Sequence, residues 1–340
     1  MTSIVDALAL SPTQAGMVAV SAAQPTYDPY LVTLALDLTG VAASQVPELR
    51  RALEELCRRH GHLAGQIRSE GLPHPVLLIR DGARPVWQTR DLRAEPDPIA
   101  AAQQIRTTEG NRPLPLSTGP LTRATLLQVS GDATDGHYVL LLTMHHVVVD
   151  GWCLPRLIGE YAALLGGAGD QVDPPVPLRT YASWIAAQDR ARSEDAWRDY
   201  LAGILDMPRV GRGTETGGAP AVGEYRLGGA ATTAVQDFAQ AHGLTLATLI
   251  QLAWGRVLSS AVGQDDVAFG STSSGRHPDI PGGDRIIGGL VTSTPVRVRI
   301  DERSPAAAGA ELQTQLAHVR RHDWLGSAGV AQAVGAGGRE

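Results

Sequence analysis

The stretch Tyr138–Trp152, YVLLLTMHHVVVDGW, decides the fold of this chain. Its first five residues form a continuous apolar run of strand length, which is typical of a strand buried on both faces of a sheet. From Trp152 to Leu165 the apolar residues recur with helical spacing, and Gly166 follows the last of them. The pattern therefore predicts a core strand, a short loop and an amphipathic helix in succession.

The loop carries three polar side chains, His145, His146 and Asp150. Polar groups between two buried elements must be hydrogen-bonded or take part in chemistry. Two interpretations are open at this point. The residues are either satisfied core groups beside a turn or members of a reactive site.

Together with Gly151, these residues resemble the HHxxxDG signature of condensation domains from nonribosomal peptide synthetases. These domains belong to a wider superfamily of acyltransferases that share an HxxxD motif. One further stretch departs from its family motif, RHxxLR, because Ala64 stands where the family has a second arginine. Including this one, five further stretches match family motifs in whole or in part. The resemblance runs from about Leu8 to about Trp324, and the stretches are LSPTQAGM at 10–17, RRHGHLA at 58–64, YASW at 181–184, SGRHP at 274–278 and IIGGLVTSTPV at 286–296.

This resemblance implies an α/β (α+β) fold with two chloramphenicol-acetyltransferase-like lobes that form a V around a central substrate tunnel. The clearest linker in the chain is GGAGDQVDPPVP at 166–177. We therefore expect an N-terminal lobe with the HHxxxDG loop over 1–168, a linker over 169–177 and a C-terminal lobe over 178–340. The second lobe is expected to be incomplete, because the closing strands and the last motif of the family have no counterpart here.

Periodicity gives further expectations for the second lobe. The apolar spacing predicts one long helix from Tyr181 to Ile204, and a short strand is expected over Tyr225–Leu227. With the strands expected over 267–272 and 290–300, the lobe has about four candidate strands.

The chemistry that the resemblance implies is peptide-bond formation in secondary metabolism, including antibiotic biosynthesis. The α-amine of an acceptor aminoacyl thioester attacks a donor acyl or peptidyl thioester, and both substrates are held on the 4′-phosphopantetheine of carrier proteins. His146 is then the catalytic candidate, as a general base or as a group that orients the amine. Gly151 leaves room for the substrate, and its N–H faces the developing oxyanion.

Supporting roles follow for the neighbouring residues. We expect Asp150 to be structural and to pair with Arg276, because a buried carboxylate needs a partner. His145 is expected to hold the loop in shape, Trp152 to pack, and Cys153 to be a small buried hydrophobe rather than a nucleophile.

The resemblance also places five residues along the substrate tunnel. Three of them, Ser11, Gln14 and Met17, lie in the stretch at 10–17. The other two, Thr292 and Ser293, lie in the stretch at 286–296 and stand where the family usually has Asn and Thr.

Composition narrows the partners. The net charge is −6, no lysine is present and no basic run occurs, so we expect no nucleic-acid partner. The chain contains no nucleotide-binding motif, and His60 and His62 lack a nearby ligand set, so no metal or bound cofactor is expected. With only two cysteines, the chain is expected in a reducing cytoplasm. We expect no secretory signal and no membrane-spanning segment, because the chain starts without a basic region and has no apolar run of about 18 residues. The expected partners are donor and acceptor peptidyl carrier proteins and a neighbouring adenylation domain.

Three functions stay open on the sequence. The first is amide formation by a synthetase condensation domain, which the motifs at 10–17, 274–278 and 286–296 favour. The second is a stand-alone acyltransferase of the same superfamily that uses CoA or another thioester. The third is a non-catalytic domain that recruits carrier or tailoring proteins, which the intact pattern from His146 to Gly151 disfavours.

Overall fold

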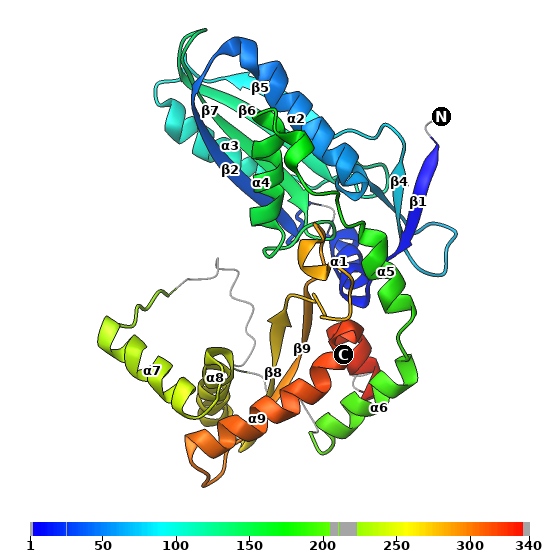
Figure 1. Cartoon of the computed structure of the whole chain (residues 1–340), viewed down its shortest axis with the longest axis vertical. Coiled ribbons are helices and arrows are strands. Elements are labelled where there is room, and N and C mark those ends of the chain that lie inside the picture. The colour runs from blue at the N-terminus through cyan, green and yellow to red at the C-terminus, as the bar shows by residue number, and fades with distance from the viewer. Residues whose placement is uncertain (1–2, 25, 205–209, 211–222, 336–340) are drawn as a thin grey trace. The chain divides into compact units, whose positions relative to one another are not determined.

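The computed structural model describes residues 3–24, 26–204, 210 and 223–335. It divides the chain into two compact units, which are coloured along the sequence in Figure 1. The first unit comprises Met1–Gln188 and Ser274–Val291, and the second comprises Asp189–Ser273 and Thr292–Glu340.

The main sheet of the first unit has the strand order β2-β7-β6-β5. The strands are β2 (Leu31–Val41), β5 (Val86–Asp91), β6 (Thr122–Gly131) and β7 (Gly136–His145). All neighbours are antiparallel except β5 and β6, which are parallel. The apolar run of the opening stretch lies in β7, a strand as the sequence predicted, and β7 is hydrogen-bonded to β2 and to β6.

Helices cover both faces of this sheet. Leu140 and Leu142 pack with α2 (Val46–Arg59) and α4 (Leu154–Leu165), which contact each other in front of the strands in Figure 1. Leu141 points to the other face, where it packs with residues of α3 (Pro98–Asn111). The strand is therefore buried on both sides, which explains why its sequence does not alternate.

A smaller sheet of the first unit has the order β1-β4-β3. Its strands are short, and the sequence patterns did not reveal them: β1 (Ile4–Ala9), β3 (Gln66–Arg68) and β4 (Val76–Arg80). Two helices accompany it, α1 (Pro12–Ala23) and α5 (Leu178–Ala186). The helix α1 begins with a side-chain cap, because the Ser11 hydroxyl accepts a bond from the Gln14 N–H.

The second unit contains the antiparallel pair β8 (Asp266–Ser273) and β9 (Thr292–Arg299). Its helices are α6 (Arg190–Leu201), α7 (Gly229–Ala241), α8 (Leu246–Val262), α9 (Pro305–Val319) and α10 (Gly326–Ala333).

Two secondary-structure predictions for this region were wrong. The long helix expected from Tyr181 to Ile204 is two helices, because Asp189 caps a new one by accepting a bond from the Arg192 N–H. The strand expected over Tyr225–Leu227 has no ladder partner among the described residues, and both of its large side chains are exposed. The described part of the second unit thus has two paired strands rather than about four.

The unit boundaries also differ from the expected lobes. The segments 178–188 and 274–291 group with the first unit, although the sequence assigned them to the C-terminal lobe. Contacts explain the grouping, since the Tyr181 hydroxyl donates to the Leu290 carbonyl at 3.4 Å and Arg276 pairs with Asp150. The linker expected over 169–177 therefore lies inside the first unit.

Candidate active site

The HHxxxDG loop joins the end of β7 to the start of α4, and its backbone is held at several points. The His146 N–H donates to the Tyr30 carbonyl at 2.7 Å, and the Val148 N–H donates to the His145 carbonyl at 3.0 Å. These bonds turn the chain sharply after the strand, so that adjacent histidines point into different surroundings.

His145 is fully buried, and both of its ring nitrogens have partners. Its Nδ1 accepts the Val147 N–H at 3.0 Å. Its Nε2 lies 3.1 Å from the Ser21 hydroxyl and 3.3 Å from the Asp28 carboxylate. Both ring nitrogens of His145 thus face groups of the surrounding protein.

His146 is only partly buried, and its ring is held differently. Its Nδ1 is buried and has no hydrogen-bond partner among the described residues. The neighbouring backbone is crowded, because a Cβ on Gly289 would lie 2.4 Å from the His146 carbonyl oxygen. The backbone of His146 is thus fixed while its imidazole stays free of protein partners at Nδ1.

Asp150 is buried, with 1% of its surface exposed, and its carboxylate is fully engaged. One oxygen accepts from Arg276 at 2.8 Å and from the N–H groups of Leu290 and Val291 at 2.9 and 3.2 Å. The other oxygen accepts the Cys153 N–H at 3.0 Å. The predicted pair of Asp150 and Arg276 is therefore present, and four protein N–H groups bond to the carboxylate.

The segment that supplies these donors depends on Gly275. Its φ of +63° is in the left-handed region, and a Cβ there would lie 1.8 Å from the Leu290 carbonyl oxygen. This close approach places Arg276 beside Asp150 of the HHxxxDG loop. Its guanidinium also donates to the carbonyls of Ile286 and Gly288 at 3.1 and 3.4 Å.

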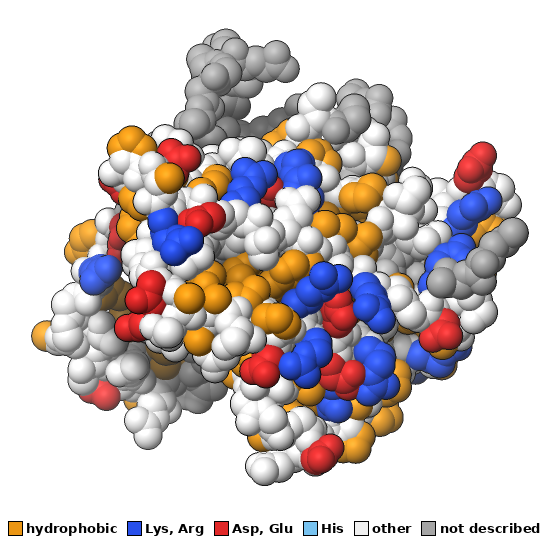
Figure 2. Space-filling view, turned by 90° about the horizontal axis from the view of Figure 1, so that it is seen from above, with side chains coloured by type: hydrophobic (Ala, Val, Ile, Leu, Met, Phe, Trp, Pro, Cys, Tyr) orange, Lys and Arg blue, Asp and Glu red, His pale blue; other side chains and the backbone are white. Residues whose placement is uncertain are grey.

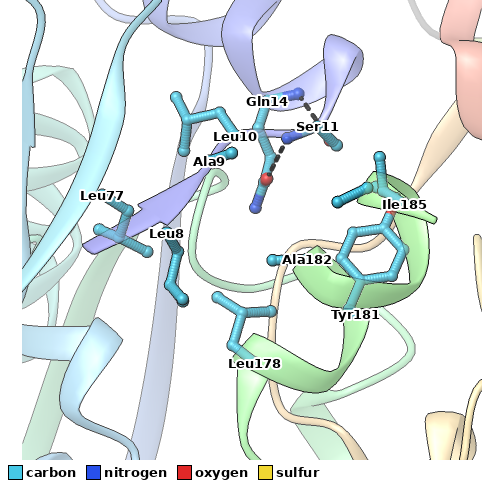
Figure 3. A pocket seen from close by; sticks show the side chains of 11 residues that line it. Leu8, Ala9, Leu10, Ser11, Gln14, Leu77, Leu178, Tyr181, Ala182 and Ile185 are labelled. Carbon is cyan, nitrogen blue, oxygen red and sulfur yellow. Dashed lines mark hydrogen bonds between the residues drawn. The ribbon is translucent and has the colours of Figure 1, made fainter. Parts of the chain in front are cut away.

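The first motif reaches the loop through Gln14. Its side-chain N–H donates to the Val147 carbonyl at 2.8 Å, while its side-chain oxygen accepts the Ser11 N–H at 2.8 Å. Figure 3 shows Ser11 and Gln14 at the edge of a cavity of about 80 Å³ that is otherwise mostly apolar. Leu8 and Leu178 form part of its wall. One motif therefore joins the loop to a small cavity.

The remaining residues of the loop have distinct environments. Gly151 is exposed, and a Cβ added there would meet no atom within 4 Å among the described residues. Cys153 is buried, and burial raises the pKa of its thiol to about 11, so the thiol stays protonated at neutral pH. Trp152, which we expected to pack, has 53% of its surface exposed.

The other tunnel candidates lie in two separate units. Met17 is buried on α1 of the first unit. Thr292 and Ser293 begin β9 of the second unit, where the Thr292 hydroxyl donates to the Asp323 carbonyl at 2.9 Å. The Ser293 hydroxyl bonds to that of Thr272 at 2.9 Å.

Two buried histidines lie in the segment that resembles RHxxLR. His60 Nε2 lies 2.9 Å from the Glu160 carboxylate, which Arg59 also approaches at 3.4 Å. His62 bonds to the Ile287 backbone, and burial together with the nearby His60 lowers the pKa of His62 to about 3. Ala64, in the place of the family's arginine, is buried in the core.

Within the described residues, no three His, Cys, Asp or Glu side chains converge as metal ligands would. The same part of the chain has no helix that is both long and apolar enough to cross a bilayer. Positive and negative side chains are interspersed over the face shown in Figure 2.

Ser21, Asp28 and Tyr30 were missed by the sequence analysis, although they touch the two histidines. One signal existed for Ser21. The buried face of α1 comprises Gln14, Met17, Val18 and Ser21, so Ser21 is a polar residue at a core position and needs a partner.

Comparison with known proteins agrees with the motifs. A family model described as the condensation domain matches residues 4–328. The chain therefore belongs to the condensation-domain family.

Curated relatives are large synthetases. Over 335 residues the chain is 30% identical to a linear gramicidin synthase from Brevibacillus parabrevis, covering 95% of this chain and 4% of that protein. Malpinin synthetase of Mortierella alpina is 32% identical over 289 residues, which cover 80% of this chain and 4% of the relative. The chain thus spans a small fraction of the length of the curated relatives.

Solved structures share the fold. The first condensation domain of the calcium-dependent antibiotic synthetase, in complex with a substrate analogue, superimposes with a TM-score of 0.73 at 18% identity. The comparison covers 98% of this chain and 78% of that structure. The starter condensation domain of rhizomide synthetase, as a mutant with C8-CoA, gives a TM-score of 0.75 at 19% identity, covering 97% of this chain and 75% of that one. The architecture is therefore the mixed α/β fold of condensation domains.

Proposed function

We propose that this chain forms peptide bonds. The α-amine of an acceptor aminoacyl thioester attacks the carbonyl carbon of a donor acyl or peptidyl thioester. An amide bond forms, the carbon–sulfur bond breaks, and the donor carrier leaves as a thiol. The amine loses one proton, so the site must position a nucleophile and manage one proton transfer.

The observation that carries this proposal is the unequal engagement of the loop's polar groups. Asp150 accepts four hydrogen bonds and His145 has partners at both nitrogens, whereas His146 Nδ1 has none among the described residues. His146 is therefore the loop histidine that is only partly buried and whose Nδ1 is not committed to a described protein partner, and we assign it to the substrate amine. An imidazole, with an ordinary pKa of about 6.5, suits either role near neutral pH.

Gly151 supports the same assignment. It directly follows the immobilised Asp150, and the space around its Cα is open among the described residues. We propose that this opening receives the reacting thioester carbonyl, with the Gly151 N–H facing the developing oxyanion.

The proposed substrates arrive on carrier proteins. We propose donor and acceptor peptidyl carrier proteins bearing 4′-phosphopantetheine as partners, an adenylation domain as neighbour, and no directly bound cofactor. The tunnel roles of Ser11, Gln14, Met17, Thr292 and Ser293 belong to the same proposal. Two free, buried cysteines suit the reducing cytoplasm in which we place the chain.

The test is a condensation assay with two loaded carrier proteins, in which the dipeptidyl product is measured for the parent chain and for His146→Ala. We expect His146→Ala to lower turnover by about 10²–10⁴-fold, the usual contribution of a proton-transfer group. His137→Ala is the matched control, because this histidine lies on the same strand with its ring partly exposed, and it should leave turnover unchanged.

Three outcomes would overturn the proposal. Near-normal turnover in His146→Ala would remove its central residue. Product formed from acyl-CoA but not from a carrier-bound donor would indicate a stand-alone acyltransferase. No product from either donor would indicate a recruitment domain.

A further inference from the structure

A buried polar cluster lies directly behind the HHxxxDG loop. The Ser21 hydroxyl donates to Asp28 at 2.8 Å, and the Tyr30 N–H donates to the same carboxylate oxygen at 2.9 Å. The other oxygen of Asp28 lies 3.3 Å from His145 Nε2. The side chains of Asp28 and His145 are 2% and 0% exposed, so water does not screen these contacts.

These contacts fix the tautomer of His145. Its Nδ1 accepts the Val147 N–H, so this nitrogen carries no proton. The single proton of a neutral ring must then be on Nε2, which faces acceptors on Ser21 and Asp28. Burial favours the neutral acid, but hydrogen bonds from His145, Tyr30 and Ser21 outweigh it and lower the pKa of Asp28. Asp28 is therefore an acceptor on both oxygens.

The same segment holds His146. Tyr30, whose N–H is bonded to Asp28, accepts the His146 N–H through its carbonyl at 2.7 Å. The bond from Val147 to His145 closes the other side of the turn at 3.0 Å. Both hydrogen bonds that flank the His146 backbone thus depend on Asp28, one through Tyr30 and the other through the tautomer of His145.

We propose that Asp28 is a positioning residue for the reaction, which acts by holding His145 as the Nε2–H tautomer and thereby sets the placement of His146. This inference rests on the proposed function, because it takes His146 as the group that handles the substrate amine. Ser21 assists by orienting the Asp28 carboxylate. No substrate contact is required of Asp28, Ser21 or His145.

Asp28→Asn tests the inference with little change in shape. The asparagine has one acceptor oxygen, and Ser21 and Tyr30 both need it. Its NH₂ group then faces His145 Nε2–H, donor against donor. The Ser21 hydroxyl is then the one acceptor left for Nε2–H. A ring that instead carries its proton on Nδ1 faces the Val147 N–H and loses the bond that closes the turn.

Two readouts separate positioning from general stability. In protein labelled with ¹⁵N in its histidines, NMR should show the Nε2–H tautomer for His145 in the parent chain, with the signal assigned by its loss in His145→Gln. Asp28→Asn should shift this signal and lower kcat by about 10–100-fold, the cost of a misplaced group, with KM nearly unchanged. Asp28→Asn should add no further loss to His146→Ala, because both act through one residue.

The matched control is Asp37→Asn. Asp37 also faces a histidine of β7 at 3.3 Å, but its side chain is 74% exposed, and the variant should change neither readout. If Asp28→Asn does not fold, Ser21→Ala takes its place. It removes the nearer of the two acceptors of Nε2, and a several-fold lower kcat with a shifted His145 signal is expected.

A His145 that carries its proton on Nδ1 in the parent chain would overturn the inference. So would an unchanged kcat and ring signal in the folded variant, whether Asp28→Asn or Ser21→Ala. The proposed function fails separately, through His146→Ala, since the tautomer is measured without any turnover.

Discussion

Strands β2 and β7 are linked by two aspartate–histidine pairs at opposite ends of the same ladder. Asp28 and His145 lie 3.3 Å apart just before β2 and at the end of β7. Asp37 and His137 also lie 3.3 Å apart, near the start of β7. The first pair is 2% and 0% exposed, and the second is 74% and 30% exposed.

The pairs differ in their surroundings and not in the distance between partners. Water competes for every group of the exposed pair, and such pairs contribute about 0–1 kcal/mol. The buried pair has no such competitor, so each donor must meet an acceptor and the tautomer is decided. Two pairs with the same distance between partners therefore differ in effect, because only the buried pair can fix the conformation of the HHxxxDG loop.

The largest effect on stability is expected for another buried pair. In Asp150→Ala the guanidinium of Arg276, with only 8% of its side chain exposed, loses its carboxylate. Such a loss costs about 3–5 kcal/mol, because a buried charge stays uncompensated. Urea unfolding should show this decrease, and the double variant Asp150→Ala/Arg276→Leu should recover part of it. A single variant within about 1 kcal/mol of the parent would show that burial does not strengthen the pair.

The next effect comes from His62, a buried histidine that has no carboxylate partner among the described residues. His62 has a folded-state pKa of about 3, against 6.5 for the exposed group. Between these values the unfolded chain binds a proton that the folded chain does not, so stability is lost as the pH falls below 6.5. At pH 5 the loss is about 2 kcal/mol, from 1.4 kcal/mol per pKa unit. Unfolding free energies at pH 7 and pH 5 measure it.

Two histidine variants serve as the test and the control for the pH dependence. His62→Gln should remove most of the decrease between pH 7 and pH 5, and the lowered pKa of the partly buried His322 accounts for a remainder. His137→Gln should keep the decrease, because His137 is partly exposed. The lowered pKa values of Glu160 and Asp28 act in a different window, below their ordinary values of 4.5 and 3.8, where stability is lost as the carboxylates protonate. An equal decrease in His62→Gln would contradict the assignment.

The buried pairs show which parts of the site the sequence could predict. The pair of Asp150 and Arg276 spans 126 positions, yet two family motifs and the need of a buried carboxylate for a partner were enough to propose it. The strand β7 and helix α4 were predictable because each has a strong local period or apolar run.

The cluster behind the loop was not predictable in the same way. Ser21 lies on α1, Asp28 in the loop before β2 and His145 at the end of β7, and their contacts arise only when α1 packs against the end of β7. The break between α5 and α6 was missed for a related reason. Apolar spacing continues across it, and only the capping bond of Asp189 ends the first helix and begins the second.

The smallest effect is expected for Asp37→Asn, and it is the variant that most directly tests the comparison. Both pairs join the same two strands, so if strand pairing alone gave the Asp28–His145 contact its importance, loss of either carboxylate would cost the same. If burial is the cause, Asp37→Asn should change the free energy of unfolding by less than about 1 kcal/mol, and added salt should make the change smaller still. Urea unfolding at low and high salt measures both quantities. If Asp37→Asn lowers the free energy of unfolding as much as Asp28→Asn does, and independently of salt, the two pairs stabilise the strand pairing equally. Burial would then give the Asp28–His145 pair no additional effect on the loop.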